Sequence, residues 1–168
     1  FRNAQLETCN FVNSELSHCN LDNASLPSTA WANTSISNTS FIAADMTSNC
    51  FVSSEDEAPC TFDDLNFSRA ILNKANLQNL ALSRTLFTDC KLNSTNFTGA
   101  DLSEANFDNA IGKQIVFRKA NLNGASLKYS DFMEGIMSKA IITDANLEAS
   151  NLYGVDFIRA TIKGTRFN

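Results

Sequence analysis

Residues 95–108 read Thr-Asn-Phe-Thr-Gly-Ala-Asp-Leu-Ser-Glu-Ala-Asn-Phe-Asp. In this stretch a large apolar side chain recurs at every fifth residue, at Phe97, Leu102 and Phe107. A small residue precedes each of them by two positions, and an Asn or Asp precedes each by one. This period matches neither the helical period of about 3.6 residues nor the strand period of about 2. The stretch is therefore part of an internal repeat, which has to be followed along the whole chain.

The five-residue period extends over nearly all of the 168 residues. One run places a large apolar residue at every fifth position from 1 to 51, and a second run does so from 62 to 167. All thirteen Phe residues occupy this position, which fixes the register of the repeat. Gly112 is the one break in the second run, and we expect Ile111 and Ile115 to fill the space it leaves.

One interval separates the two runs. Phe51 and Phe62 are eleven residues apart, which we interpret as two repeats plus one residue. The interval contains Glu55, Asp56 and Glu57 followed by Pro59. Consecutive acids and a proline predict an exposed loop over 52–61. The sequence thus predicts a single domain over 1–168, interrupted by this acidic loop.

The repeat resembles that of the pentapeptide-repeat family. The units that carry the resemblance have the form A-(D/N)-(L/F)-X-X, as at residues 75–77, 120–122 and 145–147, each of which reads Ala-Asn-Leu. The resemblance implies an all-β fold, a right-handed quadrilateral (four-sided) parallel β-helix or solenoid, with one pentapeptide per side. It also implies about eight coils of about twenty residues each. At roughly 4.8 Å per coil the rod would be on the order of 40 Å long.

In such a fold the large residue and the small residue two before it point inward, and Asn, Asp or Ser between them bond to the backbone at the corners. The expected core comprises Phe11, Trp31, Phe51, Phe67, Phe87, Phe97, Leu102, Phe107, Phe132 and Phe157. Stepping by one coil predicts an inner column of Phe11, Trp31, Phe51, Leu72, Leu92, Gly112, Phe132 and Leu152. A second predicted column consists of Phe67, Phe87, Phe107, Leu127, Leu147 and Phe167.

The five cysteines allow two interpretations. Cys9, Cys19, Cys60 and Cys90 occupy the small inward position, where a thiol serves as a compact apolar filler. Cys50 and Cys60 bracket the acidic loop, so a disulfide between them is the alternative hypothesis. His18 stands alone at an outward position, which is poor evidence for a metal site. We expect neither a metal nor a cofactor.

No residue pattern indicates catalysis. The carboxylates of residues 55–57 are adjacent rather than opposed across a cleft, so an acid–base pair is not expected. An interior filled with Phe and Leu leaves no pocket for a small-molecule substrate. No apolar run is long enough to span a bilayer, and the basic stripe of a nucleic-acid-binding protein is missing. We therefore expect no enzymatic activity and no direct binding of nucleic acid.

Charge is unevenly distributed. The chain has a net charge of −5, and residues 1–61 contain seven acids against the single cation Arg2. An acidic end of this kind is compatible with a surface that faces a partner and also with an ordinary solvated surface. The leading hypothesis is a macromolecular binding or scaffold rod, such as a bacterial effector or a targeting domain, with a protein partner at Glu55, Asp56 and Glu57. Bacterial cytoplasm and secretion into a host cell are the compartments that fit this role.

Two alternatives come from the resemblance. Quinolone-resistance proteins of the family look like duplex DNA and bind topoisomerase (gyrase), and this chain is similar to them in its acidic side and single loop. It lacks their C-terminal dimerisation segment, and its charge density is far below the one charge per ~1.7 Å of duplex. The other alternative is a β-helical recognition domain of a larger enzyme.

The uncovered edges of the first and last coils invite pairing with other strands. We therefore expect either flanking segments or an end-to-end homodimer.

Overall fold

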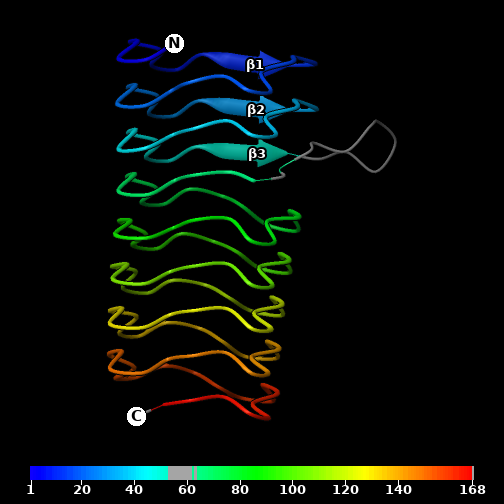
Figure 1. Cartoon of the computed structure of the whole chain (residues 1–168), viewed down its shortest axis with the longest axis vertical. Helices are drawn as coiled ribbons and strands as arrows, with labels where there is room; N and C mark the ends of the chain where they lie inside the picture. Colours follow the sequence, from blue (N-terminus) through cyan, green and yellow to red (C-terminus); the bar gives the residue numbers. More distant parts are fainter. Residues whose placement is uncertain (53–61, 63, 168) are drawn as a thin grey trace.

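The computed structural model describes residues 1–52, 62 and 64–167. These residues form an elongated stack of coils, here called the rod, with the two chain ends at opposite ends of the stack (Figure 1). Isolated parallel bridges join residues twenty apart over most of the chain, for example Asn76 to Asn96 and Asn96 to Val116. One coil therefore contains four five-residue repeats. The fold is all-β and parallel, as expected, and the described residues include no helix.

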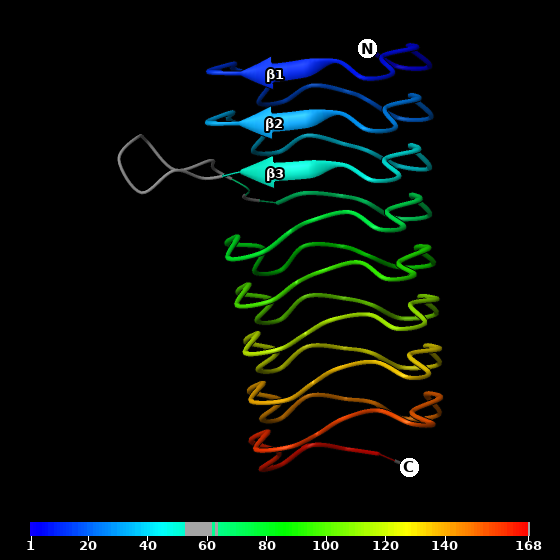
Figure 2. The same ribbon diagram turned by 180° about the vertical axis from the view of Figure 1, so that it is seen from behind.

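Three of the repeats form short strands. They are β1 (Asn10–Val12), β2 (Ala30–Ala32) and β3 (Cys50–Val52), which pair in parallel in the order β1-β2-β3. Their register aligns Phe11, Trp31 and Phe51, and both views show the three strands directly above one another (Figures 1 and 2). Elsewhere only the residue before each large apolar residue makes a bridge, because the chain turns a corner every five residues.

Each corner is a hydrogen-bonded turn. The N–H of Ala100 donates to the carbonyl of Phe97 (3.0 Å), and the N–H of Ala105 donates to that of Leu102 (3.1 Å). Two residues after the large apolar residue at the centre of a repeat, the backbone has a positive φ, as Gly99 (φ 70) and Glu104 (φ 58) illustrate. A positive φ at this place is typical of a type II turn. The residue before the large one closes the corner, since the Asn106 Oδ1 accepts the N–H of Asp108 (2.8 Å).

The interior is filled by the large apolar residues. Of the expected core, eight residues are buried, namely Trp31, Phe51, Phe67, Phe87, Phe97, Leu102, Phe107 and Phe132. Phe11 and Phe157 differ, because they lie in coils near the ends of the stack and are only half-buried against the core. Aromatic rings stack along the columns, with centroids 5.4 Å apart for Phe67 and Phe87 and 4.7 Å apart for Phe87 and Phe107.

The first predicted column is wrong beyond Phe51. Across the interruption the bridges join residues 26 apart, as in Ser40 to Asn66 and Cys50 to Asn76, so Phe51 aligns with Leu77 and not with Leu72. The column is therefore Phe11, Trp31, Phe51, Leu77, Phe97, Phe117, Met137 and Phe157. The eleven-residue interval is one repeat plus six additional residues, not two repeats plus one. The second predicted column follows the observed register and extends back to Phe41, whose ring stacks on Phe67 at 5.0 Å.

Only Val52 of the predicted acidic loop over 52–61 lies within the described residues. Val52 is the last residue of β3 and is 49% exposed. Residues 53–61 and 63 lie outside the described residues, and with them the predicted contact residues Glu55, Asp56 and Glu57 as well as Cys60.

The gap at Gly112 is filled differently from the expectation. Ile115 is fully buried, whereas Ile111 is 44% exposed and contributes little to the filling. A Cβ on Gly112 would lie 3.0 Å from Ile115 Cδ1 and 3.0 Å from the ring of Phe132. The isoleucine and the phenylalanine of the next coil therefore occupy the space of the missing side chain.

The small inward position also contains buried threonines. Their hydroxyls donate to the carbonyl of a large residue in the preceding coil, as Thr39 does to Leu16 (2.7 Å) and Thr95 to Leu72 (2.7 Å). Thr85 is fully buried in the same type of position, but its hydroxyl has no hydrogen-bond partner in the described part of the chain. A buried hydroxyl without a partner destabilises the folded state.

This contrast gives a matched pair of predictions. We expect Thr85→Val to raise the free energy of unfolding by about 1 kcal/mol, because it removes an unsatisfied buried group. We expect Thr95→Val to lower it by about 1 kcal/mol, because it removes a satisfied hydrogen bond. Denaturant unfolding followed by circular dichroism measures both. Equal effects of the same sign in the two variants would contradict this account.

Candidate functional site

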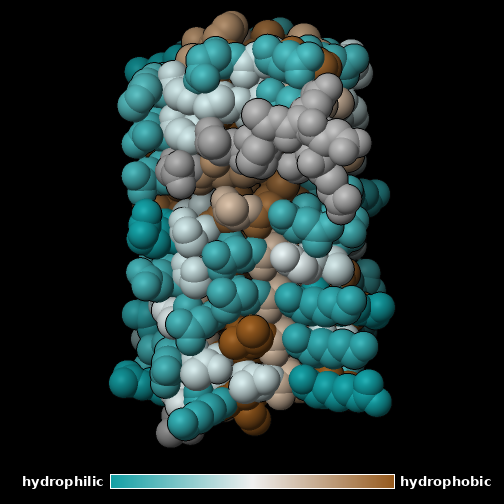
Figure 3. Space-filling model, turned by 90° about the vertical axis from the view of Figure 1, so that its right-hand side faces the viewer, coloured by the Kyte–Doolittle hydropathy of each residue, from teal (hydrophilic) through white to brown (hydrophobic). Residues whose placement is uncertain are grey.

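The outer faces of the rod present side chains in rows. Because successive coils keep a twenty-residue register, outward residues twenty apart lie over one another. In Figure 3, hydrophilic side chains stack in this way along one edge of the visible face, beside hydrophobic atoms. The hollows lined by described residues lie at the surface of the rod; one of about 240 Å³ lies beside β3 and is lined by Phe51, Val52, Asn76, Gln78 and Asn79.

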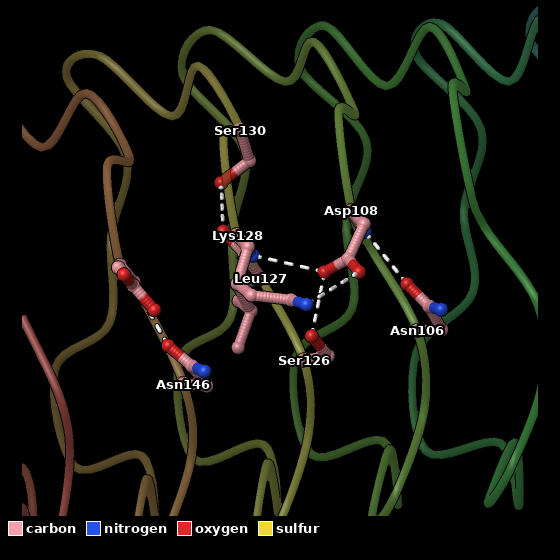
Figure 4. A network of polar contacts seen from close by, with 8 residues as sticks. Asn106, Asp108, Ser126, Leu127, Lys128, Ser130 and Asn146 are labelled. Carbon is pink, nitrogen blue, oxygen red and sulfur yellow. Dashed lines mark hydrogen bonds and ion pairs between the residues drawn. The ribbon is translucent and has the colours of Figure 1, made fainter.

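One row forms a polar network around Asp108 (Figure 4). Its Oδ1 accepts the hydroxyl of Ser126 (2.6 Å) and the backbone N–H of Lys128 (3.0 Å), both from the next coil. The Lys128 Nζ lies 3.6 Å from the other carboxylate oxygen. The carboxylate thus ties two coils together.

The same arrangement occurs around Asp22. Its Oδ1 accepts the Ser40 hydroxyl (2.5 Å) and the Ile42 N–H (3.0 Å). Burial is the largest single influence and raises the pKa of Asp22, but hydrogen bonds from Ser40, Ile42 and Asn20 together with Arg2 lower this pKa below its usual value. A lowered pKa in the folded state stabilises the fold at neutral pH, and this contribution is lost as the pH falls through the lowered pKa. These carboxylates therefore act as structural links between coils.

A second row is cationic. Lys119, Lys139 and Arg159 occupy the same corner of three successive coils, each at positive φ (59, 61 and 61) and each exposed. The Lys119 N–H donates to Ser138 O (3.0 Å), and the Lys139 N–H donates to Ile158 O (2.9 Å), which fixes the stacking of the corner. With the exposed Arg118, these three residues are called the basic cluster below.

The basic cluster frames a surface hollow of about 250 Å³. The hollow is lined by Arg118, Ser138, Lys139, Asp156, Ile158 and Arg159. The Asp156 Oδ1 accepts the backbone N–H of Ile158 (2.8 Å), so this carboxylate is engaged in its own corner turn. The two ion pairs between described residues are Lys113–Asp131 and Lys128–Asp108, and neither includes a member of the basic cluster.

The cysteines differ in burial. Cys9 and Cys19 are half-buried free thiols, and the Sγ of the half-buried Cys50 accepts a hydrogen bond from Asn76 Nδ2 at 3.9 Å. Since Cys60 lies outside the described residues, the disulfide hypothesis for Cys50 and Cys60 stays a prediction. Cys90 is fully buried, and its Sγ donates to Phe67 O (2.8 Å) as the threonine hydroxyls do.

Burial raises the pKa of Cys90 to about 12. Because the thiolate is the reactive form of cysteine, we expect Cys90 to stay unmodified by a thiol reagent in the folded protein at neutral pH. It should react only in denaturant. Mass spectrometry of alkylated peptides, with and without denaturant, measures this difference, and the half-buried Cys9 provides the internal control. Equal modification of Cys9 and Cys90 in the folded protein would contradict this prediction.

The basic cluster was not among the predicted sites, although its spacing is visible in the sequence. Lys119, Lys139 and Arg159 are twenty residues apart, which is one coil.

His18 lies exposed at an outward corner with φ 60, as predicted. Within the described ranges no three His, Cys, Asp or Glu side chains gather into a group able to hold a metal ion, and no helix long and apolar enough to cross a membrane is found there.

Known proteins share this repeat and this fold. A family model described as a pentapeptide repeat region matches residues 58–132, and one described as pentapeptide repeats (8 copies) matches residues 1–30 and 137–168. No curated protein matches the chain.

Among solved structures, a pentapeptide repeat protein from the thylakoid lumen of Arabidopsis thaliana is 29% identical, with a TM-score of 0.54. That match covers 55% of this chain and 64% of the plant protein, less than two thirds of its length. A trypsin-treated form of QnrB1, a plasmid-mediated fluoroquinolone resistance protein, is 15% identical with a TM-score of 0.54, covering 96% of this chain and 87% of QnrB1. At that identity the second likeness concerns the fold alone. With its repeats matched by both family models, the chain belongs to the pentapeptide repeat family.

Proposed function

We propose that this protein is a non-enzymatic binding rod that holds a protein partner on its outer faces, as a scaffold, an effector or a targeting domain. The observation that carries the proposal is the stack of outward side chains in fixed rows around a filled interior. In this proposal the coils form a right-handed, four-sided rod of about eight turns. A ladder offset of twenty residues, divided into five-residue repeats, supports the four sides.

The rigidity of the core supports a binding role. Large side chains such as Phe97 and Phe107 are fully buried and touch ring to ring. Coil-to-coil hydrogen bonds then hold every outward side chain at a fixed height along the rod. A partner that matches this spacing binds a backbone that is already ordered, so little backbone conformational entropy is lost on binding.

The test is retention of proteins on the immobilised chain. We expect saturable retention of a defined protein from bacterial or host-cell lysate, and we expect it to fall when Glu55, Asp56 and Glu57 are all replaced by Ala. A matched variant carries Glu7→Ala, Glu104→Asn and Glu148→Ala at three exposed acids and changes the net charge equally, with Asn at residue 104 because it tolerates the positive φ there. Absence of any saturable retention by the intact chain would contradict the binding role. Retention that is equal in all three forms would place the contact away from the acidic loop.

The same experiment separates DNA mimicry from the scaffold role. A DNA-like surface requires negative charge along the rod, whereas residues 113–168 contain eight Lys and Arg against five Asp and Glu. This distribution supports the scaffold role over DNA mimicry. DNA mimicry would instead be favoured if topoisomerase is retained by the intact chain and not by the variant without Glu55, Asp56 and Glu57. A natural gene much longer than this chain would favour the recognition domain of a larger enzyme.

A further inference from the structure

We infer that the basic cluster and its hollow bind an acidic peptide segment of a partner protein. The inference rests on the proposed binding function and names one contact surface and the class of partner for it. Arg118, Lys139 and Arg159 would contact carboxylates of the peptide, and Lys119 extends the cationic row by one coil. Ile158 lines the same hollow and is 69% exposed, so it offers a contact for an apolar side chain of the peptide.

The geometry of the cations supports an extended anionic ligand. Lys119, Lys139 and Arg159 lie in successive coils, about 4.8 Å apart along the rod. The hollow of about 250 Å³ is lined by residues from all three coils, among them Arg118 from the first and Ser138, which is only 9% exposed, from the second. Arginine side chains bind carboxylates in bidentate geometry. The surface therefore combines a row of charges with one partly enclosed position.

The charge of the cluster is not neutralised within the rod. Among residues 1–52, 62 and 64–167, no carboxylate lies within ion-pair distance of its four cations. Asp156 is the one acid that lines the hollow, and its Oδ1 is engaged by the N–H of Ile158. Three cations against one carboxylate leave the hollow with a positive excess. An anionic ligand would reduce this excess.

A peptide fits the surroundings better than a nucleic acid does. The whole chain has a net charge of −5, and residues 1–61 alone contribute −6. A long polyanion that followed the rod would run past this acidic part and be repelled. A short acidic segment needs only the cluster itself. The exposed Ile158 also suits a peptide with mixed acidic and apolar side chains, a form of recognition used by other cationic clusters.

The test uses fluorescence anisotropy with three labelled probes of equal length. They are a peptide of Glu, Asp and Leu, the same peptide with Gln and Asn in place of the acids, and single-stranded oligothymidine. The test variant carries Lys119→Asn, Lys139→Asn and Arg159→Asn. The control carries Arg69→Asn, Lys74→Asn and Arg84→Asn, which are also exposed at positive φ but lie on other sides of the rod. Asn tolerates a positive φ, and thermal unfolding shows whether both variants fold as the intact chain does.

We expect the acidic peptide to bind the intact chain and the control, and its dissociation constant to rise by about tenfold in the test variant. Stronger binding of oligothymidine, lost in the same variant, would overturn the peptide assignment in favour of nucleic acid. Absence of acidic-peptide binding, equal loss in both variants, or equal binding of the neutral peptide would overturn the inference. If the lysate experiment still retains the same protein on the intact chain and on the test variant, the binding role stands and only this surface is rejected.

Discussion

Phe107→Asp is expected to abolish the cooperative unfolding transition of the protein at neutral pH. Phe107 is fully buried, its ring stacks on Phe87 at 4.7 Å, and it meets Phe97 and Phe117 edge to face at 5.8 and 5.4 Å. A carboxylate in this position would lose its hydration without gaining a cationic partner, which costs several kcal/mol. That cost is a large part of the stability of a typical domain, about 5–15 kcal/mol.

The measurement is denaturant unfolding followed by circular dichroism. Asn109→Asp is the matched control, because it adds the same charge at an exposed corner two residues away. Phe107→Leu retains an apolar side chain and should lower the free energy of unfolding by only about 1 kcal/mol. A Phe107→Asp protein with unchanged unfolding would show that residue 107 does not point into the core.

The second large effect is expected from Gly112→Leu, which restores the regular repeat but should destabilise the fold by about 1–3 kcal/mol. A Cβ at this position already meets Ile115 Cδ1 and the ring of Phe132 at 3.0 Å, so a whole leucine side chain would overpack the coil. Ile115→Ala alone should cost about 2–5 kcal/mol, because it opens a cavity. In the double variant the leucine fills that cavity, and we expect it to be more stable than either single variant.

Unfolding free energies of the three variants form a double-mutant cycle. Leu21→Ala combined with Ile115→Ala is the control, since these buried residues lie in distant coils and their effects should add. A double variant at 112 and 115 whose loss equals the sum of the single losses would contradict the compensation. The cycle thus tests whether the exception at Gly112 and the isoleucine three residues later are one packing unit.

The fold class was predictable because the repeat has a strict register. The large apolar residue at every fifth position marks an inward position, and an Asn or Asp directly before it marks a corner hydrogen bond, as at Asn106. The burial of Phe67 and Phe107 followed from their place in the repeat alone. The alignment of the coils across the interruption could not be predicted from the repeat. No large apolar residue between Phe51 and Phe62 shows whether this interval is one repeat plus six residues or two repeats plus one residue. The bridges across the interruption, such as Ser40 to Asn66 and Cys50 to Asn76, decide between them.

The candidate surfaces were less predictable. The acidic run at residues 55–57 is visible as a local feature of the sequence, whereas the basic cluster is assembled from residues twenty apart and appears only once the coil length is applied. Ile115 lies two residues before Phe117, at the small inward position, whereas Ile111 directly precedes Gly112 at a corner position. This difference in repeat position explains why Ile115 is fully buried and Ile111 is exposed.

The 26-residue offset has a consequence for how such a sequence can change in evolution. Insertion of one residue inside a side would shift every later Phe and Leu by one position, turning inward residues outward along the remainder of the chain. Between Val52 and Phe62 the chain already contains six additional residues, yet the twenty-residue spacing resumes from Asn66 to Leu86 and onward. Insertions and deletions are therefore expected to accumulate at this one place among related sequences, while the coils on both sides keep a constant length.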